Sequence, residues 1–331
     1  MIHPADESLI RRERVLQLAD ELGNVRDVCR AERVSRSQYY AWKRRYDAQG
    51  REGLRDRRSC KPRSIEQIVI GHAVIHPMWG CHRLARYLKD TLDVTIPGPK
   101  IQDILNRHGL GYREDRAYMV EKLAGEGKIQ PPRRLIEEVA HLRPRFLEFG
   151  KIGASIGELL VQDMAVVGDF LRLGRLYVQV VVETHSCYTW AHLHVGRTAE
   201  AAVEALRSEV LPFFERRGWL PDAIRTPRDP WYYAPKRKDE PLHPYRAELK
   251  YLRMVHKLIP SSIRNGLVTS FLDEVRAQIF RPVLFDGVER DLGEMQETLD
   301  RWLDDYNRRP LDGFPTDGQS PASFWPKLPY E

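Results

Sequence analysis

Three apolar or alternating runs follow one another closely in the second half of the chain: GELLVQDMAVV, GRLYVQVVVE and CYTWAHLHV. Short separators between such runs are typical of strands joined by hairpins, so this stretch restricts the fold to one built on antiparallel strands. Further along, the pattern predicts helix 199–218, strand 222–226, helix 243–253, strand 254–259 and two closing helices at 265–280 and 288–307. This order of strands and helices predicts an α/β fold with a sheet of mixed direction.

Surplus positive charge is confined to the N-terminal part of the chain. The whole chain carries a net charge of +6. Residues 1–63 hold 16 Lys and Arg against 10 Asp and Glu, whereas the remaining residues hold equal numbers of each sign. A local surplus favours a local polyanion site over a generally basic protein. A solvated charged surface is the alternative.

This N-terminal segment has the pattern of a helix-turn-helix. Residues 14–24 carry apolar side chains at helical spacing and end at Gly23-Asn24, and a second short helix is predicted over 25–31. Ser35 is a suitable N-cap for a third helix that runs to Gly50.

The third helix has two distinct sides. On a helical wheel Tyr39, Trp42 and Tyr46 share one side, which we expect to pack on the first two helices. A mostly basic outer side is typical of a helix that enters the DNA major groove. The predicted DNA contacts on that side are Arg36, Ser37, Tyr40, Lys43 and Arg44.

At 331 residues the chain has room for two or three domains. Composition and periodicity predict a helix-turn-helix domain at 1–50, an extended basic linker at 51–64, a second helix-turn-helix-like domain at 65–113, a charged connector with a partly helical end at 114–150, and the α/β domain at 151–331. In the second helical domain, Lys100, Asn106 and Arg107 are further candidate DNA contacts. Structural packing is the alternative for them.

Several other classes of protein and site lack support in the sequence. There is no apolar run of the length that a membrane helix needs, and the polar N-terminus does not resemble a signal peptide, so we expect a cytoplasmic protein without a membrane partner. The four Cys are far apart and form no CxxC pair, which argues against a disulfide framework or a common zinc motif.

A series of motifs follows the helix-turn-helix in a set order. They are HPMWGCHRL, PGPKIQDILNRHGLGYR, GELLVQD, LYVQVVVETHS, AIRT, HPY, NGLV and YNRRP. In this order, from about Arg12 to Pro326, the chain resembles bacterial insertion-sequence transposases with a retroviral-integrase-type core. The resemblance implies a ribonuclease-H-like catalytic domain that joins element ends to target DNA. It also implies double-stranded DNA as the partner and a homo-oligomer that pairs DNA ends.

The resemblance further implies a site of two Asp and one Glu that holds two Mg²⁺ ions. Such ions activate the attacking oxygen and stabilise the leaving oxygen in phosphodiester chemistry, and Mg²⁺ prefers oxygen ligands. Asp163 matches the first Asp. At the second position stands Pro227, within IRTPRDPWYY, and at the third stands Thr269, within NGLVTSF. The triad is therefore degenerate, with Asp163 as a remnant and a weak metal ligand.

Two nearby acids are possible substitutes. Asp229 lies two residues beyond Pro227, and Asp273 lies one helical turn beyond Thr269. The prolines around Asp229 disturb strand geometry, and a ligand displaced by one turn, about 5.4 Å, does not meet the same metal.

We therefore expect a transposase-like DNA-binding protein without catalytic activity and without a cofactor. One alternative is an active Mg²⁺-dependent transposase or integrase that uses the displaced Asp229 and Asp273. The other alternative is a decayed element without a selected function.

Overall fold

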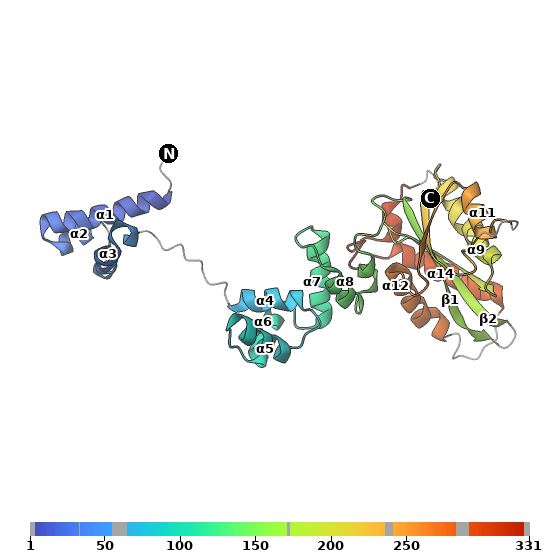
Figure 1. Cartoon of the computed structure of the whole chain (residues 1–331), viewed down its shortest axis with the longest axis horizontal. Helices are drawn as coiled ribbons and strands as arrows, with labels where there is room; N and C mark the ends of the chain where they lie inside the picture. Colours follow the sequence, from blue (N-terminus) through green and yellow to red (C-terminus); the bar gives the residue numbers. More distant parts are fainter. Residues whose placement is uncertain are drawn as a thin grey trace. The chain divides into compact units, whose positions relative to one another are not determined.

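The chain divides into two units, Met1–Ile68 and Val69–Glu331. Figure 1 shows the computed structural model of the chain. The structure describes residues 4–32, 34–54, 65–170, 173–235, 241–282 and 291–327. Within these residues, no helix is both long enough and apolar enough to cross a membrane.

The first unit is helical. Its elements are α1 (Pro4–Leu22), α2 (Val25–Ala31), α3 (Arg36–Gln49) and the 3-10 helix η1 (Gly50–Leu54). Buried apolar side chains from the three helices, among them Val15, Val28 and Tyr39, form its core. The predicted α2 and α3 are confirmed, but α1 begins ten residues before the predicted start. The predicted stop holds, since Gly23 follows α1 with φ +61°, a conformation that glycine adopts without strain.

Residues 51–54, predicted as the start of the linker, belong to this unit instead. Leu54 is fully buried in the core of the first unit, and its carbonyl accepts a hydrogen bond of 2.9 Å from Arg12 Nη1. The sequence did not predict this role, because a single leucine at the end of a charged stretch forms no periodic apolar pattern. The rest of the predicted basic linker, residues 55–64, lies outside the described residues.

The segment predicted as a second helix-turn-helix-like domain contains three helices, α4 (Ile65–Ile75), α5 (Cys81–Leu92) and α6 (Gly98–Arg107). The following segment is more helical than predicted, with α7 (Arg113–Gly125), α8 (Arg133–Ala140) and η2 (Pro144–Glu148). The many charges of this segment hid an apolar stripe, since Ala117, Val120 and Ala124 of α7 are all buried.

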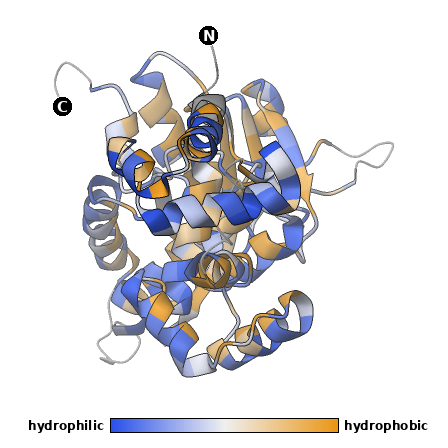
Figure 2. Ribbon diagram, turned by 90° about the vertical axis from the view of Figure 1, so that its left-hand side faces the viewer, coloured by the Kyte–Doolittle hydropathy of each residue, from blue (hydrophilic) through white to orange (hydrophobic). Residues whose placement is uncertain are grey.

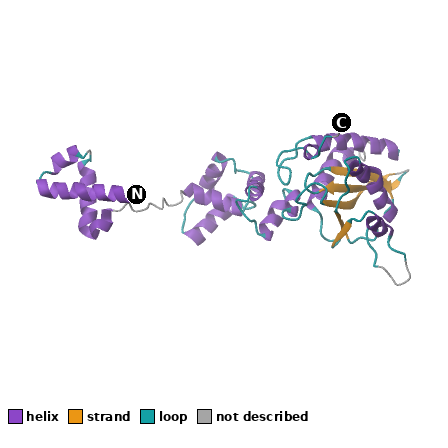
Figure 3. Ribbon diagram, turned by 90° about the horizontal axis from the view of Figure 1, so that it is seen from above, coloured by secondary structure: helices purple, strands orange, loops and turns teal. Residues whose placement is uncertain are grey.

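A five-stranded mixed sheet forms the centre of the second unit (Figure 3). Its strands are β1 (Leu159–Phe170), β2 (Gly174–Glu183), β3 (Thr189–Val195), β4 (Ala223–Pro227) and β5 (Val255–Ile259), in the order β3-β2-β1-β4-β5. The first three strands are antiparallel neighbours, whereas β4 runs parallel to β1 and β5 runs parallel to β4. The predicted α/β fold of mixed direction is confirmed, and it fits the ribonuclease-H-like core that the motif order implied.

Helices cover both faces of the sheet. One face packs on α12 (Gly266–Val275), its π-helical extension η4 (Arg276–Phe280) and α14 (Leu292–Arg308). The other packs on α9 (Ala199–Ala205), η3 (Leu206–Val210), α10 (Leu211–Glu215) and α11 (Pro244–Tyr251), and the short η5 (Pro321–Phe324) follows near the C-terminus. The helices carry both hydrophilic and hydrophobic stretches, as elements between a core and solvent do (Figure 2).

The alternation of side chains along β1 decides which core each one enters. Val161 belongs to the core under α12, whereas Leu160 belongs to the core under α11. Successive residues of a strand point to opposite faces, so Asp163 shares the face of α12 and Gln162 shares the face of α11. The hydrogen bond of 2.6 Å from the Tyr245 hydroxyl on α11 to Gln162 Oε1 agrees with this assignment.

Candidate functional site

The helix α3 presents most of the predicted DNA-contacting residues to solvent. Ser35 caps the helix, because its hydroxyl accepts a hydrogen bond of 3.2 Å from the Gln38 N–H. Tyr39 is buried against α1 and α2, which orients the helix. The outer face then exposes Arg36, Ser37, Tyr40 and Arg44. Guanidinium and hydroxyl groups on an exposed helix face are suited to phosphate and base-edge contacts.

Lys43, also predicted to contact DNA, is already engaged. Its ammonium lies 2.9 Å from Asp20 Oδ1 on α1, and the hydrogen bond to that carboxylate raises the pKa of Lys43. A phosphate would have to compete with Asp20 for this lysine. The sequence pattern places Lys43 on the outer face but carries no sign of the acidic partner on another helix.

The candidate DNA contacts of the second helical segment lie on α6. Lys100, Asn106 and Arg107 are all exposed. Asn106 has a local role as well, because its Oδ1 accepts a hydrogen bond of 2.8 Å from Gln102 Nε2 on the same helix. A Cβ atom at residue 111 would lie 2.2 Å from that Oδ1, so Gly111 allows the chain to turn closely past α6. Asn106 is therefore partly a structural residue.

Asp163 lies at the position that the motif resemblance gave to the first catalytic carboxylate. The parallel register pairs Val161 of β1 with Arg225 of β4, and two residues further along these strands stand Asp163 and Pro227. Asp163 is partly buried, and its Oδ1 accepts a hydrogen bond of 2.7 Å from the Met164 N–H. The structure thus brings Pro227, the residue at the second family position, to the strand next to Asp163.

The charge of Asp229 acts on Asp163. The pKa of Asp163 is raised to about 6, chiefly by burial, with a contribution from the negative charge of Asp229, while the Met164 N–H and the positive charge of Arg264 oppose the shift. Asp229 is held in a tight turn, because its carbonyl accepts hydrogen bonds from the N–H groups of Tyr232 (3.0 Å) and Tyr233 (2.9 Å). Of the two possible substitutes, Asp229 is the one whose charge acts on Asp163.

The third position carries no acid. Thr269 lies in the first turn of α12 and is partly buried, whereas Asp273 lies one turn further on and is exposed. Among the residues that the structure describes, no group of three or more His, Cys, Asp or Glu side chains has an arrangement that could hold a metal ion. Two carboxylates beside a proline and a threonine do not fit a cage for two Mg²⁺ ions, which demand several oxygen ligands in octahedral geometry.

The residues around the start of α12 have clear structural roles. Asn265 caps the helix, with its Oδ1 accepting hydrogen bonds from the N–H groups of Leu267 and Val268. A Cβ atom at residue 266 would lie 2.0 Å from the Pro144 carbonyl oxygen, so only glycine fits there. The Asn-Gly pair of the NGLV motif is therefore explained by packing.

Glu148, which the sequence did not single out, joins three elements at this point. Its carboxylate lies 2.7 Å from Arg225 Nη1 on β4 and accepts a hydrogen bond of 3.1 Å from the Gly266 N–H. Glu148 is buried on η2. A buried ion pair with a further hydrogen bond fixes η2 against both the sheet and α12. Nothing distinguishes this acid in sequence from the other charges of the predicted connector.

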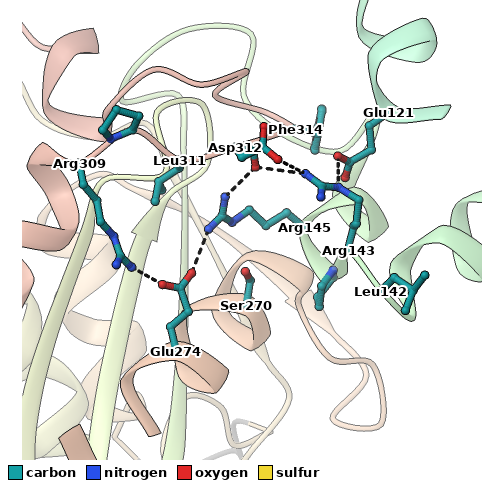
Figure 4. A pocket seen from close by; sticks show the side chains of 12 residues that line it. Glu121, Leu142, Arg143, Arg145, Ser270, Glu274, Arg309, Leu311, Asp312 and Phe314 are labelled. Atoms are coloured by element: carbon teal, nitrogen blue, oxygen red, sulfur yellow. Dashed lines mark hydrogen bonds and ion pairs between the residues drawn. The ribbon is translucent and has the colours of Figure 1, made fainter. Parts of the chain in front are cut away.

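Another charged cluster lines a pocket of about 340 Å³ (Figure 4). Arg145 Nη2 lies 3.4 Å from Glu274 Oε1, and Arg143 Nη2 lies 3.2 Å from Asp312 Oδ2. Arg143 also pairs with Glu121, and Arg309 also pairs with Glu274. Burial raises the pKa of Glu121 to about 7, although the positive charge of Arg143 opposes the shift. Since every arginine of the cluster is bound to a carboxylate, we interpret it as a clamp between α7, α12 and the segment 309–314.

Comparison with known proteins gives one family and several distant structures. Residues 11–63 match a family described as a helix-turn-helix domain. The chain is also similar to a chain of the simian T-cell lymphotropic virus intasome in complex with the PP2A regulatory subunit B56 gamma, with 15% identity over 54% of this chain and 58% of that chain, at a TM-score of 0.42.

Two integrase catalytic core domains give similar values. The core domain of HTLV-2 integrase, in complex with magnesium, is 13% identical over 52% of this chain and 98% of that chain, at a TM-score of 0.39. The core domain of BIV integrase is 14% identical over 51% of this chain and 93% of that chain, at a TM-score of 0.35. The first unit is thus a helix-turn-helix domain by sequence, whereas the likeness of the core to these structures is distant.

Proposed function

We propose that this chain is a transposase-like protein that binds double-stranded DNA through α3 and does not catalyse strand transfer. The exposed face of α3 supports the binding role most directly, because it gathers Arg36, Ser37, Tyr40 and Arg44 on a capped helix of a helix-turn-helix domain. In such domains the second helix of the motif enters the major groove.

The side chains at the core positions support the absence of catalysis. Two-metal phosphodiester chemistry needs ligands that clamp both the attacking and the leaving oxygen. Here Pro227 and Thr269 occupy two of the three positions, and the residues that remain do not fit that pair of ions.

One observation favours the rival enzyme. Asp229 lies two residues beyond Pro227, and its negative charge is one of the causes that raise the pKa of Asp163. The third acid of that hypothesis, Asp273, is exposed and lies one turn beyond Thr269, a displacement of about 5.4 Å along the helix. A decayed element without selected function is the remaining alternative, and it predicts weak binding without a preferred site.

Binding to duplex DNA tests the first part of the proposal. A preferred duplex is selected from a random pool, and its affinity for the wild-type chain is compared with that for Arg36→Ala and Arg44→Ala. We expect each variant to weaken binding by about tenfold and to reduce the salt slope by about one phosphate contact. Arg133→Ala, which removes an exposed arginine of α8 with the same change of charge, is the control. If both α3 variants bind the duplex with unchanged affinity, the proposal that α3 enters the major groove is wrong.

A nicking and joining assay with Mg²⁺ on the selected duplex tests the second part. We expect no product from the wild-type chain. Product that disappears in Asp163→Asn and Asp229→Asn would instead establish the rival enzyme. A purified chain that selects no sequence at all would support the decayed element.

We also expect the chain to form a homo-oligomer, since pairing of two DNA ends requires two copies of a DNA-binding unit. Light scattering during gel filtration, with and without the selected duplex, measures the mass. A monomer under both conditions would contradict this expectation.

A further inference from the structure

An exposed arginine follows each of the parallel strands β4 and β5. Within the described residues, neither Arg228 nor Arg264 forms an ion pair, and both are exposed. By contrast, Arg225, only three residues before Arg228, is paired with the buried Glu148. Arg225 therefore has a structural role, whereas Arg228 and Arg264 are available to a ligand.

The two cations lie at one edge of the sheet. The strands β4 and β5 are parallel, so their carboxyl ends meet at the same edge. The Arg228 N–H donates a hydrogen bond of 2.9 Å to the carbonyl of Ile259, the last residue of β5, and Arg264 follows Ile259 by five residues.

Two aromatic rings that follow β4 lie against guanidinium groups. Tyr233 has two guanidinium groups over its ring, those of Arg228 at 5.6 Å and Arg246 at 5.1 Å from the ring centroid. Trp231 has the guanidinium of Arg197 at 5.1 Å from its centroid. Both aromatic side chains are only partly buried. Cation–π contacts of this kind hold guanidinium groups in place without neutralising their charge.

This composition is the one that a single nucleic-acid strand needs. A positively charged surface follows the phosphates, and neighbouring aromatic rings stack with unpaired bases, at about 1–3 kcal/mol for each base. A duplex offers no exposed base faces to such rings. Pro227 and Thr269 are uncharged, so these two positions add nothing to the repulsion of phosphates by Asp163 and Asp229.

We propose that residues 228–233, which follow β4, together with Arg197, Arg246 and Arg264, bind a single DNA strand without a metal ion. We call this set, which includes Arg228, Trp231 and Tyr233, the strand-binding surface. The inference deepens the proposed function, because it gives the non-catalytic core its own DNA contact, separate from the duplex contact of α3.

The test measures binding of fluorescein-labelled dT20 to the full chain by anisotropy, with EDTA present and over a range of salt concentrations. Arg228→Ala combined with Arg264→Ala removes two cations. The matched control, Arg133→Ala combined with Arg134→Ala, removes two exposed arginines that are paired with Glu137 and Glu138 on α8. A third variant, Arg228→Lys combined with Arg264→Lys, keeps the charge.

We expect the first variant to lose about 10- to 30-fold in affinity for dT20 at 0.1 M salt, with a salt slope smaller by about 1.4, as two phosphate contacts on a single strand imply. The control should lose much less, and the lysine variant should recover most of the affinity. An equal loss in the control, no loss in the first variant, or binding that EDTA abolishes would each overturn the proposal.

Failure here is distinguishable from failure of the proposed function. Arg36→Ala should weaken binding of the selected duplex and leave dT20 binding unchanged, whereas the loop variant should do the reverse. If both variants weaken only duplex binding, α3 remains the DNA contact and the strand-binding surface does not exist.

Discussion

Helix α3 and the start of α12 differ in which of the residues expected from the sequence motifs they carry. On α3, the residues that fold the helix, Ser35 and Tyr39, and the residues that can contact DNA are all present. At the start of α12, the residues that fold the site, Asn265 and Gly266, are present, but the acid expected one turn later is Thr269. Folding and chemistry thus depend on different residues, so the absence of catalysis that we propose requires no change in the fold.

The largest expected effect tests whether the core site is held by its scaffold. Glu148→Ala removes the partner of Arg225 and leaves its guanidinium nearly buried without a counter-charge. We expect a loss of about 3–5 kcal/mol in the free energy of unfolding. Urea denaturation followed by circular dichroism measures it. Glu137→Ala, in an exposed pair with Arg133, is the control and should change stability little. A similar small change in both variants would mean that Glu148 does not hold the site.

A second substitution separates packing from chemistry in the NGLV motif. Gly266→Ala forces a Cβ to within 2.0 Å of the Pro144 carbonyl oxygen, so backbone must move. We expect a loss of about 1–3 kcal/mol. The matched change Gly71→Ala on α4, where a Cβ meets no atom within 4 Å, should stabilise by about 0.5–1 kcal/mol. A stable Gly266→Ala variant would show that packing does not explain this glycine.

The third prediction concerns Asp163 and pH. Its pKa is about 6 in the folded chain against an ordinary 3.8, so the folded state binds more protons between these values and stability falls as pH rises from about 4 to 6. Asp163→Asn cannot ionise and should be about 1–3 kcal/mol more stable than wild type at pH 7.5, with no gain at pH 3.5. Urea midpoints at both pH values measure the difference. Glu121 adds a fall of the same sign up to about pH 7 in both proteins, so only their difference is informative. Equal stability of the two proteins at both pH values would contradict this assignment.

The smallest effect sharpens the description of α3. Since Asp20 already binds the ammonium of Lys43, Lys43→Ala should reduce affinity for the selected duplex by only about two- to threefold, against about tenfold for Arg36→Ala. Asp20→Ala should raise affinity by about two- to threefold, because it releases the lysine and removes a negative charge. If Lys43→Ala costs as much as Arg36→Ala, then Lys43 leaves Asp20 to contact DNA.

Sequence reasoning was accurate where one element carries its own signal. The cap at Ser35, the stop at Gly23 and the strand pattern of β1 to β5 all follow from local spacing, and the structure confirms them. It was less accurate where a residue acts through a distant partner. Glu148 and Arg225 meet across 77 positions of sequence, and Lys43 and Asp20 meet across 23. No periodic pattern reports such pairs.

The candidate site could be predicted only in part, for a related reason. The positions of Asp163, Pro227 and Thr269 follow from motif order, but the neighbourhood of Asp229 depends on the turn in which its carbonyl accepts two hydrogen bonds. No local pattern in the sequence singles out Trp231 and Tyr233, and only their contacts with arginines distinguish them. Contacts of a loop depend on tertiary structure, which local patterns do not report.

Leu54 sets a limit on how this chain can be divided. A fragment that ends at Gly50, where the third helix stops, would lack the leucine that fills the floor of its three-helix bundle and would leave Arg12 without its carbonyl acceptor. The shortest fragment that we expect to be soluble and folded on its own therefore ends after Leu54. The same limit applies to recombination that joins this unit to another protein, because a junction before Leu54 would remove a core residue from the helical bundle.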